Sequence, residues 1–129
     1  MQSARESILV VDDDPMVIDL VSQLLGEEGY RIDSAGDGRD ALEGLKQHLP
    51  DVILLDLMMP RMDGFSVLSA LQSDATLRDI PVVVLTAKSL SQEERKLLKE
   101  RSLAVIHKQG LEREQLLKEV ETASQAVGG

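Results

Sequence analysis

Residues with potentially reactive side chains lie at the ends of runs of aliphatic residues. Asp12 and Asp13 follow SILVV at 7–11, and Asp56 ends DVILLD at 51–56. A carboxylate in such surroundings is costly unless a charge or a hydrogen bond compensates it. Asp56 therefore marks either the point where a strand reaches solvent or a place where the charge is used chemically.

The carboxylates of Asp12, Asp13 and Asp56 converge if the strands before them are neighbours in one parallel sheet. Two like charges about 4 Å apart repel by about 4 kcal/mol at an effective dielectric constant of 20. Such a cluster must hold protons or recruit a cation. The ligands are all oxygens, with neither His nor Cys among them. This set suits Mg²⁺, which shares its octahedron with one or two carboxylates, waters and a phosphate.

Two later strand ends add a hydroxyl and an ammonium group. Thr86 ends PVVVLT at 81–86, and Lys108 follows LAVIH at 103–107. Carboxylates, Mg²⁺, a lysine and a hydroxyl together form a site for a phosphoryl group. One carboxylate in such a site is free to act as a nucleophile.

The elements that must position these residues alternate between two patterns. Short runs rich in Val, Ile and Leu predict strands at 7–11, 31–35, 51–56, 81–86 and 103–107. Three of these runs are continuously apolar, as in parallel strands that are covered on both faces. Apolar residues at helical spacing predict helices between the strands. We expect them from Asp14-Pro15 to before Gly29, from Gly38 to His48, from Gly64 to about Ser73, from a Ser91/Glu94 capping box onward, and from about Glu112 to Ala126.

Strands alternating with helices predict an α/β fold. We expect a doubly wound (βα)5 parallel five-stranded sheet, a flavodoxin-like three-layer sandwich. At 129 residues the chain is expected to form a single domain over 1–129, with its core at about 7–126. Ligands of such sheets bind outside the carboxyl ends of the strands, where the strand order reverses. We therefore expect the carboxylates, the hydroxyl group and the lysine described above to lie at this edge.

Composition disfavours several classes of function. The net charge is −9 and aromatic residues make up 2% of the chain, which opposes attraction to a polyanion and leaves no stacking platform for bases. The chain has no cysteine, so neither a disulfide nor a thiolate metal site can form. No apolar run approaches the roughly 20 residues that span a bilayer. We therefore expect a soluble, cytoplasmic protein with no direct nucleic-acid binding and no membrane partner.

The chain contains, in this order, the segments ILVVDDDP, VILLDLMMPRMDG, VVVLTA and VIHKQG. Together they resemble the landmarks of response-regulator receiver domains. The resemblance implies a phosphoacceptor signalling domain of a two-component phosphorelay, which is not an enzyme in its own right but can catalyse its own phosphotransfer and slow autodephosphorylation. Its partner would be a sensor histidine kinase or a histidine phosphotransfer protein carrying phosphohistidine. The ending HKQGLEREQLLKEV resembles that of receivers attached to hybrid sensor histidine kinases.

The same resemblance assigns the metal ligands and the nucleophile. Asp56 would be the phosphoacceptor. Asp13 and Asp56 would bind Mg²⁺ directly, and the backbone carbonyl of Met58 would be a further ligand. Asp12 would act mostly through water.

Two more residues would act on the phosphoryl group itself, again by resemblance. Lys108 would hold a phosphoryl oxygen. Thr86 would move to hydrogen-bond the phosphoryl group once it is present.

Two other classes of function compete with this interpretation. A Mg²⁺-dependent phosphatase can also use an aspartyl nucleophile, but it needs a second acid two residues later, where this chain has Met58. A receiver-like binding scaffold that is never phosphorylated would be favoured by loss of Asp13, Asp56 or Lys108, and all three are present.

The chain departs from the receiver pattern near its fifth strand. Receivers usually have Lys-Pro where this chain has Lys108-Gln109, and an aromatic residue where it has Val105. A cis bond before proline costs about 0.5–1 kcal/mol, whereas before another residue it costs about 2.5–4 kcal/mol. We therefore predict a trans Lys108-Gln109 bond, with Gly110 absorbing the turn. Because Val105 has no ring to swing inward, we expect phosphorylation to restructure the neighbouring face less than usual.

Several other polar residues are predicted to be structural. Asp14, before Pro15, is expected to cap a helix. His107 is interpreted as a packed strand residue, and His48 as a group that complements the dipole at a helix end. Asp63 is interpreted as a turn former.

Overall fold

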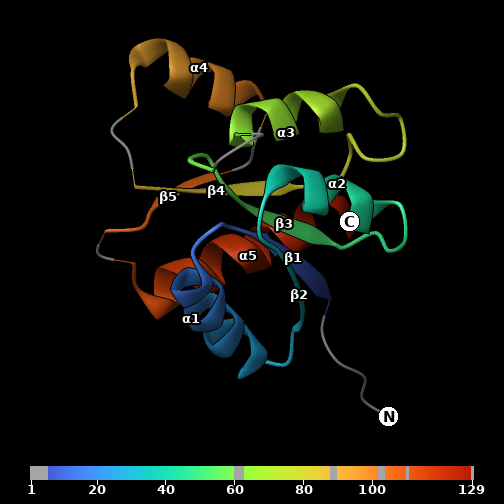
Figure 1. Ribbon diagram of the computed structural model, residues 1–129. Helices are drawn as coiled ribbons and strands as arrows, with labels where there is room; N and C mark the ends of the chain where they lie inside the picture. Colours follow the sequence, from blue (N-terminus) through green and yellow to red (C-terminus); the bar gives the residue numbers. More distant parts are fainter. Residues whose placement is uncertain (1–5, 60–62, 88–89, 102–103, 110, 129) are drawn as a thin grey trace.

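The computed structural model describes residues 6–59, 63–87, 90–101, 104–109 and 111–128. Within these ranges, strands and helices alternate along the chain (Figure 1). The strands are β1 (Ser7–Val11), β2 (Arg31–Ala35), β3 (Val52–Asp56), β4 (Val82–Thr86) and β5 (Ala104–His107). The helices are α1 (Pro15–Gly26), α2 (Gly38–Leu45), α3 (Gly64–Gln72), α4 (Gln92–Arg101) and α5 (Arg113–Gly128).

The strands form one parallel sheet in the order β2-β1-β3-β4-β5. Strand β2 lies on one side of β1, and β3, β4 and β5 follow on the other side. The direction in which strands are added to the sheet therefore reverses between β1 and β3. The predicted doubly wound fold is therefore confirmed. Every residue of β1, β3 and β4 is buried, as expected of strands covered on both faces.

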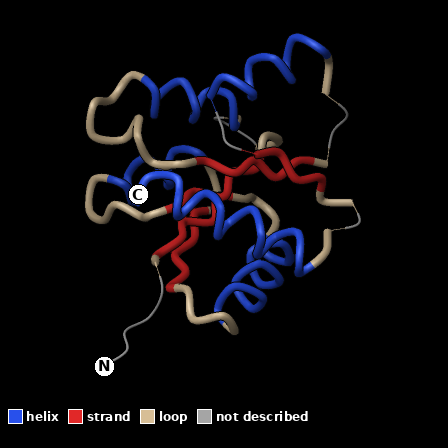
Figure 2. Tube along the Cα trace, turned by 180° about the vertical axis from the view of Figure 1, so that it is seen from behind, coloured by secondary structure: helices blue, strands red, loops and turns tan. Residues whose placement is uncertain are grey.

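Helices cover both faces of the sheet (Figures 1 and 2). On one face, α1 and α5 pack on alternate residues of the strands, such as Val10 and Leu54. On the other face, α2, α3 and α4 pack on the intervening residues, such as Val11 and Leu55. This division confirms the predicted three layers.

Short polar side chains start the helices. The Asp14 carboxylate accepts a hydrogen bond from the Met16 N–H at 2.9 Å, which confirms its predicted capping role. Asp63 does the same for the N–H of Ser66 at the start of α3. The predicted capping box is also present: the Glu94 N–H donates to Ser91 Oγ at 3.1 Å, and the Ser91 N–H donates to Glu94 Oε1 at 3.0 Å.

Two histidine predictions are wrong. Helix α2 ends at Leu45, so His48 lies beyond the helix and cannot complement its last turn. Its ring lies 3.4 Å from Ser7 Oγ instead. His107, the last residue of β5, is exposed and not packed.

The peptide bond after Lys108 has the predicted geometry. The described residues contain no cis peptide bond, which confirms the trans Lys108-Gln109 bond. The Lys108 N–H donates to the Thr86 carbonyl at 2.9 Å, and the Leu111 N–H donates to the Lys108 carbonyl at 3.2 Å. Gly110, predicted to absorb the turn, lies outside the described residues, as does Leu103 of the predicted fifth strand.

None of the described helices is both long enough and apolar enough to cross a membrane.

Candidate functional site

The sheet order brings the acidic residues together. Strands β1 and β3 are neighbours in parallel register, with Val11 opposite Leu55. Asp12, which directly follows β1, and Asp56, which ends β3, therefore meet at the carboxyl edge of the sheet. One oxygen each from Asp12, Asp13 and Asp56 lies within 4.8 Å of the others. We call these three residues the acidic cluster; their predicted convergence is confirmed.

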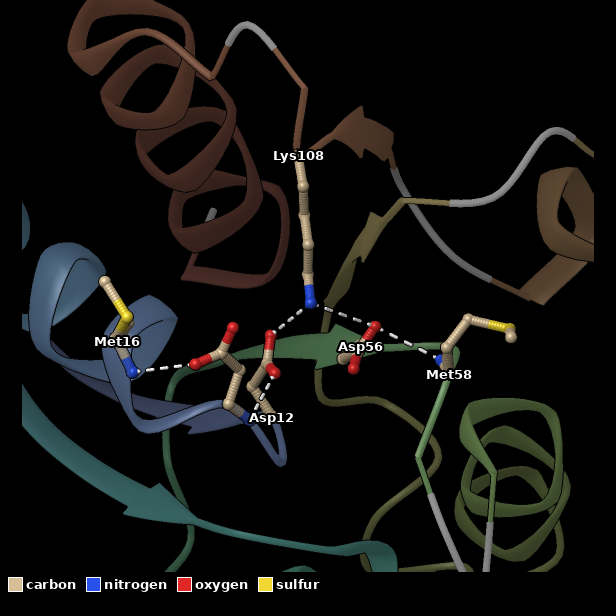
Figure 3. Close-up of polar contacts among 6 residues, drawn as sticks. Asp12, Met16, Asp56, Met58 and Lys108 are labelled. Atoms are coloured by element: carbon tan, nitrogen blue, oxygen red, sulfur yellow. Dashed lines mark hydrogen bonds and ion pairs between the residues drawn. The ribbon is translucent and has the colours of Figure 1, made fainter.

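Lys108 reaches the acidic cluster from two strands away (Figure 3). Its Nζ lies 2.7 Å from Asp12 Oδ2 and 3.4 Å from Asp56 Oδ1. Strand β4 separates β5 from β3, so only a long side chain can span the distance. The Lys108 backbone is fixed meanwhile by its hydrogen bond to the carbonyl of Thr86.

The two innermost carboxylates are buried. Asp12 is 0% exposed and Asp56 is 1% exposed. One oxygen of each is held by the loop that follows: Asp12 Oδ1 accepts from the Asp14 N–H at 2.9 Å, and Asp56 Oδ1 accepts from the Met58 N–H at 3.1 Å. The second oxygen of Asp56 is buried and accepts no hydrogen bond from any described group. This oxygen is therefore buried without a proton donor from the described residues.

Burial dominates the electrostatics of Asp56. It raises the pKa of this carboxyl from 3.8 to about 6, and the negative charge of Asp12 adds to the rise. The Met58 N–H and the Lys108 ammonium oppose it. Burial by itself lowers the pKa of Lys108, but the contacts with Asp12 and Asp56 outweigh it, so the pKa of Lys108 is raised. At neutral pH, Asp56 is thus mostly ionised and Lys108 remains a cation.

The cluster fits a divalent cation. Its donors are carboxylate oxygens, one of them buried without a hydrogen bond, and two carboxylates share one ammonium. Asp13, unlike the other two acids, is exposed, so it faces the solvent from which a hydrated ion arrives. Few oxygen ligands beside open solvent suit Mg²⁺, which keeps several waters.

Two other predicted site residues lie at the same edge. Thr86 ends β4 and is 0% exposed. Met58 follows Asp56 by two residues and is 54% exposed; Figure 3 shows its backbone N–H beside Asp56 and its side chain directed away. The residue two places after Asp56 thus contributes a backbone N–H to the carboxylate, while its apolar side chain lies in solvent.

A glycine on α3 fixes the backbone of Asp56. The Gly64 N–H donates to the Leu57 carbonyl at 3.1 Å. A Cβ at Gly64 would lie 2.6 Å from both the Asp56 carbonyl oxygen and the Leu57 Cα, which no side chain can do without moving the backbone. The start of α3 therefore packs directly on the end of β3. Sequence reasoning did not identify this role, which depends on tertiary packing.

Sequence reasoning also missed a polar cluster at the opposite edge of the sheet. Asp51 Oδ2 accepts from the Ser7 N–H at 2.8 Å and from Ser7 Oγ at 3.5 Å. His48 contacts the same hydroxyl. We call Ser7, His48 and Asp51 the amino-edge cluster. Asp51 contacts the serine and not the histidine, so the cluster lacks the relay of a hydrolytic triad; it ties β1 to the loop before β3.

Comparison with known families agrees with this fold. The family described as the response regulator receiver domain matches residues 8–121. The chain therefore belongs to the receiver domains of response regulators, the signalling domains of two-component systems.

Individual relatives cover different parts of the chain. It is 42% identical over 89 residues to the DNA-binding response regulator MtrA of Mycolicibacterium smegmatis, over 69% of this chain and 38% of MtrA. It is 51% identical over 85 residues to the response regulator PleD of Caulobacter vibrioides, over 66% of this chain and 18% of PleD. These matches thus span less than half the length of either relative.

Solved structures match nearly the whole chain. One is the signal receiver domain of a signal transduction histidine kinase from Syntrophus aciditrophicus, with 30% identity, a TM-score of 0.86 and coverage of 95% of this chain and 92% of that one. Another is the N-terminal domain of a response regulator receiver protein from Methanoculleus marisnigri JR1, with 39% identity, a TM-score of 0.76 and coverage of 91% and 94%.

Proposed function

We propose that the chain is a single receiver domain, with its core at about 7–126, that accepts a phosphoryl group on Asp56. The donor is a phosphohistidine on a sensor histidine kinase or a histidine phosphotransfer protein. The observation that carries the proposal is the Asp56 carboxylate itself. It is 1% exposed, has one oxygen without a hydrogen bond, and lies 3.4 Å from the Lys108 ammonium.

Transfer would proceed by displacement at phosphorus. An ionised Asp56 oxygen forms the new P–O bond while the P–N bond to the donor imidazole breaks, and the electron pair of that bond leaves with the ring nitrogen. A pKa of about 6 leaves Asp56 ionised at neutral pH and more basic than an ordinary aspartate, which favours nucleophilic attack. Lys108 supplies a fixed positive charge for a phosphoryl oxygen, and the Thr86 hydroxyl is proposed to hydrogen-bond another.

The acidic cluster would hold Mg²⁺ during this reaction. We assign Asp13, Asp56 and the backbone carbonyl of Met58 as direct ligands and Asp12 as a ligand through water. When bound, the ion offsets the negative charge of the incoming phosphoryl group. The three carboxylates of the cluster repel one another because they lie close together. A bound divalent cation would relieve this repulsion.

The output is proposed to be contact with another protein. A net charge of −9 opposes direct binding of this chain to nucleic acid. The relative MtrA is described as a DNA-binding response regulator, and the match covers 38% of its length. The phosphatase alternative remains disfavoured, because Met58 offers an apolar, half-exposed side chain where a second acid is needed.

Intact mass measurement after incubation with acetyl phosphate and Mg²⁺ tests the proposal. One phosphoryl group should be added to the parent and none to Asp56→Asn. Asp51→Asn is the matched control, because it makes the same change at the other end of β3 and should be labelled like the parent. Undiminished labelling of Asp56→Asn would refute the assignment, and absence of labelling in the parent would favour the binding scaffold.

A further inference from the structure

A cleft of about 250 Å³ lies between α2, the edge strand β2 and the loop that precedes β3. The buried part of its lining is apolar and consists of Leu9 of β1, Ala35 of β2 and Pro50 of the loop. We call this feature the α2–β2 cleft. Its volume is close to the lower end of the range of ligand pockets, so it fits a small ligand.

Strand β2 contributes a carboxylate to the cleft. Asp33 lies opposite Leu9 in the register of the two parallel strands, and residues that lie opposite each other share a face of the sheet. Leu9 belongs to the core cluster on the side of α2. Asp33 is therefore on the face that α2 covers, where an apolar side chain would ordinarily pack, and it lines the cleft.

Helix α2 contributes a second carboxylate and leaves space beside it. Asp40 and Gly44 are four residues apart, so they lie on the same side of the helix, and both line the cleft. A Cβ at Gly44 would have nothing within 4 Å. The helix backbone at Gly44 therefore faces open space.

The two carboxylates are not neutralised within the described part of the chain. Neither the Asp33 nor the Asp40 side chain forms an ion pair or a hydrogen bond with a described residue. None of the described residues that line the cleft is a lysine or an arginine. The cleft therefore attracts a cation.

The spacing of the polar groups favours an organic cation over a metal ion. Asp33, Asp40 and His48 all line the cleft, but they do not form a group whose ligand atoms lie within 4.8 Å of one another, as the acidic cluster does. A single metal ion needs such convergent ligands. Separated carboxylates beside an apolar lining instead suit a cation with a body of its own, for which the Gln47 amide is a further hydrogen-bond partner.

We propose that the α2–β2 cleft binds a small organic cation, an amine or amidine with a compact apolar body. The body lies against Leu9 and Ala35, and the N–H groups donate to the carboxylates of Asp33 and Asp40. The cleft shares no residue with the acidic cluster, so this inference does not depend on phosphoryl transfer to Asp56.

Three ligands of similar shape test the proposal by NMR titration of the ¹⁵N-labelled, unphosphorylated full chain. Benzamidine is a cation, benzamide is neutral and benzoate is an anion. Benzamidine should shift the amide signals of β2 and α2, with a dissociation constant on the order of 1–10 mM, as expected of so small a ligand. Its affinity should fall as salt is added. Benzamide should bind more weakly, and benzoate more weakly still.

Variants separate the charge of the cleft from its shape. Asp33→Asn and Asp40→Asn should each weaken benzamidine binding about two- to fivefold. The matched control Asp19→Asn removes an exposed carboxylate from α1, on the other face of the sheet, and should leave binding unchanged. Gly44→Leu alters no charge but places a side chain in the open space beside α2, so it should also weaken binding. Circular dichroism confirms that each variant is folded.

Three results would overturn the inference. The first is that benzamidine leaves the signals of β2 and α2 unshifted or binds no more tightly than benzamide. The second is that Asp33→Asn and Asp19→Asn affect its binding equally. The third is tighter binding of the peptide Gly-Arg-Gly than of benzamidine, which would assign the cleft to a side chain of a partner protein.

Discussion

An aspartate lies at each end of strand β3, and the two aspartates differ in their exposure to solvent and in their hydrogen bonds. Asp51, just before the strand, is exposed, and its Oδ2 accepts hydrogen bonds from the backbone and hydroxyl of Ser7. Asp56, at the other end, is 1% exposed and leaves one oxygen without a hydrogen bond. The residue type is the same; only the surroundings differ.

This difference distinguishes a carboxylate that stabilises the fold from one that is available for a reaction. At the amino edge, hydrogen bonds compensate the charge and tie β1 to β3, so the aspartate stabilises the fold. At the carboxyl edge, burial and a neighbouring acid raise the pKa of Asp56, so its charge is held at the expense of stability. A buried acid with an unsatisfied oxygen beside two others is the signature of a functional site.

The largest expected effect is on the pH dependence of stability without Mg²⁺. Because the pKa of Asp56 is raised from 3.8 to about 6, the folded state binds a proton more tightly than the unfolded state. This contribution to stability is complete below the unfolded pKa and is lost as the pH rises through the folded pKa, amounting to about 3 kcal/mol. The unfolding free energy of the Asp56→Asn variant should therefore be higher than that of the parent. The difference should grow as the pH rises from the unfolded pKa to the folded pKa of Asp56.

Urea denaturation of both proteins across the acidic to neutral range, in the presence of EDTA, measures that margin. Taking the difference between the two proteins removes the contribution of every other group. A margin that is the same at all pH values would show that Asp56 is not the titrating residue.

The next largest effect concerns Mg²⁺ affinity. Asp13→Ala removes a proposed direct ligand, which should weaken binding by at least about tenfold, since even residues that only support a ligand are worth that much. Affinity for the parent should also fall as the pH decreases through about 6, because protons compete for the carboxylates. Isothermal titration calorimetry measures both.

Asp14→Ala is the control for that experiment. It removes the same charge one residue later, but Asp14 caps α1 and lies outside the acidic cluster. Its Mg²⁺ affinity should remain close to that of the parent, while its stability should fall by about 1 kcal/mol from the lost cap. Equal losses of affinity in the two variants would contradict the proposed ligand set.

The smallest effect is expected at the amino edge. Asp51→Ala removes the acceptor of the Ser7 N–H at 2.8 Å and should lower the unfolding free energy by about 1–2 kcal/mol. Labelling by acetyl phosphate should be unaffected once the variant is folded. A gain in stability, like that expected for Asp56→Asn, would remove the contrast between the two ends of β3.

The fold and the acidic cluster could be predicted because each depends on local pattern. Short runs that contain Val, Ile or Leu predicted the strands to within one residue, and strand-end placement predicted that Asp12, Asp13 and Asp56 converge. The reach of Lys108 could also be anticipated, since a lysine side chain is long enough to extend from the end of β5 across β4 to the acids.

The features that were missed depend on how distant segments meet. His48 and His107 were assigned from their neighbours in sequence, whereas their surroundings are set by β1 and by the end of β5.

The contact between Gly64 and the end of β3 restricts how the domain can change over time. Because a methyl group at position 64 would lie 2.6 Å from the main chain of Asp56 and Leu57, no substitution there is neutral, including the smallest. Gly44 on α2 has nothing within 4 Å of the same position and can be exchanged for alanine without a clash. A side chain is thus sterically tolerated at Gly44 and excluded at Gly64, and a displacement of α3 must carry the end of β3 with it.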